Sequence, residues 1–284
     1  MKPQPFAYRR AASLADACAM LDAHAGNARI LAGGQSLIPS LALRLSQPEL
    51  LIDISQLADL RGIRVTATEM VIGALTRHAD IERSPEVRRL FPTLADAARH
   101  IAHPAIRNRG TIGGSLALAD PAAEWPAAAL AFDMRVTAVS SQGERVLAAT
   151  DFFKGLYETA LEPGEVLKSI HVPLPGANQR AAFGELTRRS GDYAIVGAFV
   201  NAGMSGSKLS APRVAFFAVA SQALLAKGAM RALDGSNGDA AALTAARACL
   251  EADLDPIADL YNGRATKLHL CGVLLGRLLA KLTA

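Results

Sequence analysis

The sequence has few of the residues that build metal centres or disulfide frameworks. Its 284 residues include three cysteines, Cys18, Cys249 and Cys271, which are far apart and form no CxxC pair. Scattered single cysteines are typical of buried thiols in a reducing compartment and argue against a disulfide framework or a cysteine metal site. We therefore expect a cytoplasmic protein.

Long apolar runs and an excess of one charge are also missing. The longest uncharged stretch, residues 193–207, contains three glycines and is shorter than the roughly 20 apolar residues that span a bilayer. Residues 1–20 carry charges where a signal peptide has its apolar core. The net charge of +4 is spread along the chain, without the basic runs and interleaved aromatics of a nucleic-acid-binding face. We expect no transmembrane segment, no export and no nucleic-acid partner.

No arrangement of residues suggests a catalytic centre that acts on substrate directly. There is no Ser-His-Asp pattern and no pair of carboxylates suited to hydrolysis. His100 and His103 are three residues apart, but neither has an acidic or cysteine partner nearby, so we expect no metal site. The remaining histidines are isolated, and we expect them to lie at the surface or at helix caps: His24, His78, His171 and His269.

The first third of the chain alternates strand and helix patterns. Ser13 is suited to cap a helix over 14–24, ending near Gly26. A strand–helix–strand unit follows at 28–34, 36–45 and 49–55. Further on, the pattern predicts a strand at 70–76 and helices near 77–83 and 93–101.

Strands then predominate until the final helices. Apolar alternation over 134–141 and 143–149 predicts a hairpin. Strand candidates follow at 181–189, 193–205 and 213–220, and the alanine- and leucine-rich remainder predicts helices that pack into a core. Prolines and glycines punctuate residues 162–177, so we place a domain boundary near 177. Runs of strands followed by helices favour an α+β protein with two domains.

Two glycine doublets are the strongest local signals. Gly33–Gly34 lies in "AGGQSLIP" (32–39) after a strand-like run, and Gly113–Gly114 follows the acid-free segment 99–110 with its three arginines. Backbone N–H groups freed in such a turn can bind an anion, so two doublets together could hold a diphosphate. Each doublet alone is more typical of an ordinary hairpin or tight turn. Neither segment has the GxGxxG or GxxxxGK[ST] pattern.

Together, "AGGQSLIP" and "IRNRGTIGGSLALADPAAEWP" (106–126) resemble the two FAD-binding segments of the flavin subunits of molybdenum hydroxylases, a family that includes carbon monoxide and xanthine dehydrogenases. The resemblance includes "GEVLKSIHVPLP" and "LTRRSGDYAIVGAF" and covers essentially the whole chain. It implies an α+β fold with a vanillyl-alcohol-oxidase-like (PCMH-type) FAD-binding domain over 1–177, in lobes 1–56 and 57–177. A smaller C-terminal domain of antiparallel strands and helices, 178–284, would cover the flavin.

The resemblance also implies two segments around the FAD diphosphate. Gln35 stands where many relatives have histidine, and Ser115 where many have asparagine or aspartate. The implied residues are Ala32, Gly33, Gly34, Gln35, Ser36 and Leu37 in the first segment and Thr111, Ile112, Gly113, Gly114 and Ser115 in the second.

Other residues would contact the two ends of the cofactor. By resemblance, Glu124 and Leu167 match contacts at the adenosine end, and Asp192 and Tyr193 reach the isoalloxazine from the C-terminal domain. Relatives often carry a lysine at or next to the position of Gly184, where this chain reads "FGELT". We expect the single tryptophan, Trp125, to pack beneath the second segment rather than on the flavin.

The implied function is electron transfer within a larger enzyme. FAD on this chain would accept electrons from [2Fe-2S] clusters of a small subunit, while a large subunit carries the molybdenum cofactor. The electrons would pass to an external acceptor, in a dimer of heterotrimers. Three scattered cysteines cannot hold the clusters, which fits a dedicated FAD subunit. Two alternatives remain: a free-standing flavin-dependent reductase or oxidase, and a non-catalytic flavin-binding module.

Overall fold

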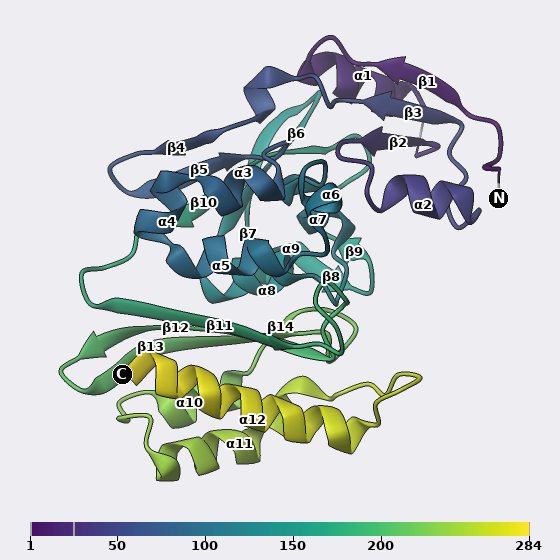
Figure 1. The fold of residues 1–284 in the computed structure, drawn as a ribbon. Coiled ribbons are helices and arrows are strands. Elements are labelled where there is room, and N and C mark those ends of the chain that lie inside the picture. The colour runs from purple at the N-terminus through teal and green to yellow at the C-terminus, as the bar shows by residue number, and fades with distance from the viewer. Residues whose placement is uncertain (1, 25, 284) are drawn as a thin grey trace.

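The computed structural model describes residues 2–24 and 26–283. Three main sheets follow one another from the N-terminal end of the molecule to the C-terminal end (Figure 1). A small parallel sheet forms the first layer, an antiparallel five-stranded sheet with several helices the second, and an antiparallel four-stranded sheet backed by helices the third. This mixed architecture confirms the predicted α+β class.

The first sheet has the strand order β1-β3-β2, and all its strands are parallel. Parallel neighbours need a crossover connection, which helices α1 and α2 provide. The predicted cap is present, because Ser13 Oγ accepts the Asp16 N–H at the start of α1. The predicted strand–helix–strand unit is confirmed, and β1 is an additional strand that the sequence pattern did not reveal. The elements are β1 (Ala7–Arg10), α1 (Leu14–Ala23), β2 (Ala28–Leu31), α2 (Leu37–Ala42) and β3 (Leu50–Asp53).

The second sheet has the order β4-β5-β10-β6-β7 and is antiparallel. The predicted hairpin is confirmed as β6 and β7, whose ends meet at Ser140 and Gly143. The elements are η1 (Ala58–Leu60), β4 (Ile63–Val65), β5 (Glu69–Gly73), α3 (His78–Arg83), α4 (Pro85–Leu90), α5 (Pro92–His100), α6 (Pro104–Arg107), α7 (Ile112–Leu118), α8 (Glu124–Ala131), β6 (Arg135–Ser140), β7 (Gly143–Ala148), α9 (Ala149–Phe152), β8 (Phe153–Gly155), β9 (Glu158–Thr159) and β10 (Val166–Pro173).

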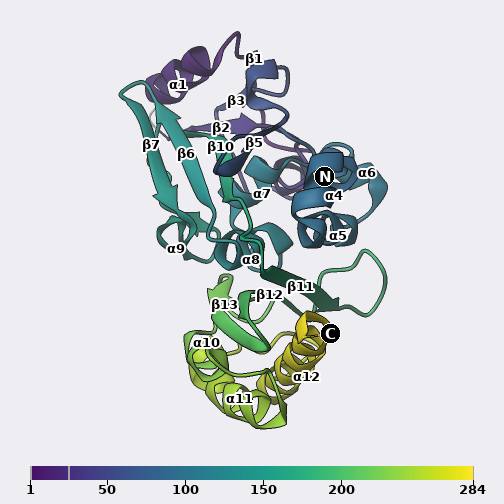
Figure 2. The ribbon, with the colours of Figure 1, turned by 90° about the vertical axis from the view of Figure 1, so that its left-hand side faces the viewer.

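The third sheet, β11-β12-β13-β14, lies between the second lobe and the C-terminal helices (Figure 2). As predicted, the final helices are part of a core: leucines of α12 are buried against β11 and β12. Across the described residues, no helix is both long and apolar enough to cross a membrane. The elements are β11 (Gln179–Leu186), β12 (Val196–Ser205), β13 (Lys208–Phe217), β14 (Leu224–Leu225), α10 (Lys227–Leu233), α11 (Ala240–Leu254) and α12 (Arg264–Thr283).

The two faces of the third sheet belong to different cores. Phe183, Phe199 and Phe217 pack in one continuous cluster with Trp125 and Phe132 of the second lobe. The opposite face packs against α10, α11 and α12 in a separate cluster. The sheet is therefore joined to the second lobe by buried aromatic contacts.

Candidate functional site

The first glycine doublet forms a turn and also allows a close approach between two segments. Gly34 has a φ of +73°, the left-handed region that favours glycine. A Cβ on Gly33 would lie 2.2 Å from the carbonyl oxygen of Arg109 and 2.8 Å from Cα of Gly110. The Gly33–Gly34 turn therefore lies directly against the segment that leads into the second doublet.

The first doublet also carries unused hydrogen-bond donors. The backbone N–H groups of Gly33, Gly34 and Gln35 find no acceptor among residues 2–24 and 26–283. The Gln35 side chain turns back and donates to the Gly33 carbonyl at 3.0 Å, and α2 begins one residue after Ser36. Consecutive free N–H groups of this kind can bind an anion.

The second doublet differs from the prediction, because it lies in the first turn of helix α7 and not in a loop. Thr111 caps this helix and accepts the Gly114 N–H at 3.1 Å. The N–H groups of Ile112 and Gly113 bond to the carbonyls of Thr76 and Ala74. The hypothesis that this doublet offers free N–H groups is therefore wrong for these three residues.

Close packing explains the glycines of the second doublet. A Cβ on Gly113 would lie 2.5 Å from Cβ of Ala74. At Gly114 an added Cβ meets Thr111 Oγ1 at 2.9 Å and comes within 4.0 Å of Cβ of Ala32. A side chain at position 114 would thus enter the space between the two segments.

A cavity of about 310 Å³ lies beside this junction. Glycine-turn residues and Thr111 both contribute to its wall, and none of its described lining residues is acidic. Three arginines give it a positive field suited to phosphate. Its lining is Ala32, Gly33, Ser55, Gln56, Arg61, Leu75, Arg77, Asn108, Arg109 and Thr111.

A buried histidine–tryptophan pair lies beside the second segment. Trp125 is 1% exposed and its indole N–H donates to His78 Nδ1 at 3.0 Å, so its predicted packing role is confirmed. The surface role predicted for His78 is wrong, because the ring is buried against Gly110. Burial, with a smaller effect of the Arg107 charge, lowers the pKa of His78 to about 4, so the ring is neutral and accepts the indole proton.

The other isolated histidines follow the prediction only in part. His24 is the C-cap of α1, and His269 is exposed. His171 is a half-buried strand residue, contrary to the prediction, and its Nδ1 bonds to Glu69 at 2.8 Å. A lone histidine in the sequence does not show which neighbours will cover it.

Tyr193 and Asp192 lie in the loop 187–195 between β11 and β12. The sequence predicted a strand from 193, but β12 begins at Val196. Tyr193 is 72% exposed, and its hydroxyl donates to Asp120 Oδ2 at 3.3 Å, across from the C-terminal domain to the second lobe. Desolvation of this hydroxyl and the Asp120 carboxylate raise the pKa of Tyr193 to about 12, so it remains a donor at neutral pH.

Glu124 lies near the same interface. It is the first residue of α8, and burial raises the pKa of its carboxyl to about 8, with smaller effects from Glu185 and Asp120. Leu167 is buried in β10 at a bulge in the pairing with β6.

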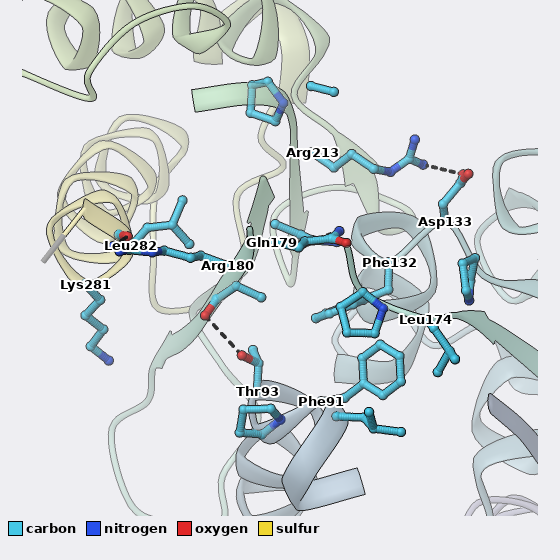
Figure 3. A pocket seen from close by; sticks show the side chains of 18 of the residues that line it. Phe91, Thr93, Phe132, Asp133, Leu174, Gln179, Arg180, Arg213, Lys281 and Leu282 are labelled. Carbon is cyan, nitrogen blue, oxygen red and sulfur yellow. Dashed lines mark hydrogen bonds and ion pairs between the residues drawn. The ribbon is translucent and has the colours of Figure 1, made fainter. Parts of the chain in front are cut away.

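A larger cavity lies elsewhere and is lined by none of these residues. It measures about 810 Å³ and opens between α5, the linker after β10 and the end of α12 (Figure 3). Its cations do not converge on a common point: Arg180 donates to the Leu282 carbonyl, Arg213 pairs with Asp133, and Lys281 points away. The candidate site is therefore the junction of the two glycine segments.

Comparison with known proteins gives this junction its context. The FAD binding domain in molybdopterin dehydrogenase matches residues 4–175, and the CO dehydrogenase flavoprotein C-terminal domain matches residues 181–282. The chain belongs to the family of FAD-binding subunits of molybdenum hydroxylases. The family, the oxidoreductase class and the FAD cofactor predicted from the sequence are thereby confirmed.

Individual relatives of this flavin subunit cover nearly its whole length. The 6-hydroxypseudooxynicotine dehydrogenase complex subunit alpha of Paenarthrobacter nicotinovorans is 40% identical over 99% of this chain and 95% of its own. The carbon monoxide dehydrogenase medium chain of Hydrogenophaga pseudoflava is 38% identical over 98% and 97%.

Solved structures of related enzymes have the same fold as this chain. A carbon monoxide dehydrogenase structure from the same Hydrogenophaga species superposes with a TM-score of 0.96 at 39% identity, covering 99% of this chain and 98% of that one. Quinoline 2-oxidoreductase from Pseudomonas putida 86 gives 0.93 at 38% identity, covering 100% and 98%.

Proposed function

We propose that this flavin subunit holds the FAD diphosphate at the junction of residues 32–37 and 111–115 and relays electrons from a partner subunit to an external acceptor. The observation that supports the proposal is the backbone contact of Gly33 with Arg109 and Gly110. It brings together the free N–H groups of the first segment and the capped helix of the second, beside a cavity lined by three arginines.

The two segments have different tasks in this proposal. The N–H groups of Gly33, Gly34 and Gln35 bind phosphate oxygens, and Ala32, Ser36 and Leu37 fix the turn to helix α2. Thr111, Ile112, Gly113, Gly114 and Ser115 form a rigid opposing wall, because their hydrogen bonds are made within the protein. Residues 32–37 and 111–115 together form the proposed diphosphate site.

The remaining predicted residues extend the site away from the diphosphate. Asp192 and Tyr193 contact the isoalloxazine end, and Leu167 the adenosine end. Glu124, like Leu167, contacts the adenosine end, as the resemblance implies. When bound, FAD supplies the redox chemistry, because its ring system exchanges one or two electrons.

The proposed assembly follows from the subunit names of the relatives, which are medium, alpha or beta chains of larger enzymes. We place this chain with an iron–sulfur small subunit and a molybdenum-cofactor large subunit, in a cytoplasmic dimer of heterotrimers. Its free cysteines lie on three separate helices, α1, α11 and α12, which suits clusters on a partner. Three separate sheets support the division into lobes 1–56 and 57–177 and a domain over 178–284.

The substitution Gly114→Asp tests the diphosphate site. It places a negative charge in the space between the two segments. We therefore expect the protein to fold but to contain at least about ten times less bound FAD. Gly176→Asp is the matched control, since nothing lies within 4 Å of a Cβ there. Flavin absorbance per folded chain is the measurement, and full FAD in Gly114→Asp would refute the assignment.

A further inference from the structure

Glu185 is a buried carboxylate near the end of strand β11. Successive residues of β11 point to opposite sides, so Glu185 shares a face with Phe183, which belongs to the core of the second lobe. A Cβ on Gly184 would point the other way, toward Leu274 and Leu278 of α12. Glu185 therefore faces the FAD-binding domain, and its side chain is only 5% exposed.

Only one oxygen of this carboxylate has a partner. His100 Nδ1, at the end of α5, lies 3.1 Å from Glu185 Oε1, and the His100 ring meets Phe183 edge to face. Glu185 Oε2 is buried and meets no donor in the described part of the chain. A buried acceptor without a donor destabilises a fold, so such an atom calls for an explanation.

In a second histidine–glutamate pair, both carboxylate oxygens have hydrogen-bond partners. His171 Nδ1 lies 2.8 Å from Glu69 Oε1, and Arg135 bonds the other oxygen, Oε2, at 2.5 Å. Both oxygens of Glu69 are thus satisfied within the protein. Glu185 retains one unused acceptor, and that acceptor lies at a domain interface.

The loop that carries Asp192 and Tyr193, two residues of the candidate flavin site, lies beside this interface. A Cβ on Gly191 would lie 2.4 Å from the ring of His103, so the loop that carries Tyr193 packs against the residues just after His100. In Figure 2 this loop projects from the end of β11 beside α5. The charge of Glu185 also acts on Glu124.

We propose that Glu185 Oε2 accepts a hydrogen bond from a ring N–H of the FAD isoalloxazine and that His100 positions and partly neutralises this carboxylate. The inference rests on the proposed function, since it needs FAD at this interface. A carboxylate next to the ring disfavours added electron density, so it lowers the reduction potential of the flavin. Glu185 is then a cofactor-binding residue and His100 a positioning residue.

Opposite shifts of the flavin midpoint potential test this inference. Glu185→Gln removes the negative charge and is expected to raise the potential. His100→Gln keeps a polar side chain but removes the cation that offsets Glu185, so it is expected to lower the potential. The measurement is spectroelectrochemical titration of the full chain with FAD at pH 6, below the usual imidazole pKa of about 6.5. Hydrogen bonding to Glu185 raises the pKa of His100 further, with contributions from Asp96 and Glu124.

Glu69→Gln is the matched control, because it removes the carboxylate of the completed pair, and its potential should equal that of the parent. Unchanged potentials in both test variants, or shifts in the same direction, overturn the inference. If Glu185→Gln fails to fold, the His100→Gln result decides, since that side chain is 44% exposed. Parent protein that binds no FAD refutes the proposed function itself, whereas bound FAD with unshifted potentials refutes only this inference.

Discussion

Gly33–Gly34 and Gly113–Gly114 are the same dipeptide, and each is followed by a polar residue. They lie in segments that contact each other, but their structural roles differ. The first doublet leaves its N–H groups free in a left-handed turn. The N–H groups of the second doublet donate to Thr111 Oγ1 and to the Ala74 carbonyl. The absence of side chains at this doublet allows close packing. Neighbouring acceptors, and not the glycines themselves, decide whether such a doublet can bind an anion.

The largest expected effect comes from adding one methyl group to each doublet. Gly33→Ala and Gly113→Ala both create contacts shorter than 3 Å, so each should destabilise the fold by about 1–3 kcal/mol in denaturant unfolding. Gly33→Ala also separates the two segments and should release FAD, whereas Gly113→Ala should retain it. Equal loss of FAD in the two folded variants would show that the doublets are equivalent.

A smaller effect is expected at Gly34. Its φ is +73°, and a Cβ there would meet Ile38 Cγ1 at 3.1 Å. Gly235, which follows α10 in the C-terminal domain, has the same φ and no atom within 4 Å of a Cβ. Alanine at either position should cost about 1–2 kcal/mol of stability through backbone strain. Only Gly34→Ala should also weaken FAD binding, as measured by flavin release during dilution, and equal binding in both variants would remove this turn from the site.

The smallest effect on stability is expected at Tyr193, in the loop between β11 and β12. Tyr193→Ala should change stability by less than about 0.5 kcal/mol, because the residue is 72% exposed. FAD should stay bound, while the flavin spectrum and the rate of reoxidation by an acceptor change. Val146→Ala truncates another exposed side chain, in β7, and is the control. An unchanged spectrum and reoxidation rate in Tyr193→Ala would exclude this residue from the site.

Local sequence patterns predicted the first segment well, because strand β2, the glycine turn and helix α2 depend on neighbouring residues. The same reasoning missed helix α7. Two glycines lower helix propensity, but the Thr111 cap and packing on Ala74 outweigh that cost. The Tyr193 loop was read as strand because its apolar run is continuous with β12.

Contacts between distant segments could not be predicted from one sequence. The burial of His78 depends on Trp125, 47 positions away, and the pairing of His100 with Glu185 spans 85 positions. The resemblance to flavin subunits supplied candidate site residues, but the structure was needed to show which donors and acceptors among them remain unused.

The aromatic cluster between the third sheet and the second lobe limits how the two domains can be separated or exchanged. Phe132 meets Phe91 and Phe199 edge to face, and Phe199 meets Phe183, so rings from both domains form one core. During synthesis the FAD-binding domain emerges first, and this face stays uncovered until β11, β12 and β13 have been made. A chimera of two relatives that is joined at the linker after β10 therefore has to preserve the packing between the aromatic residues of the two domains. A single peptide connection at the linker is not sufficient.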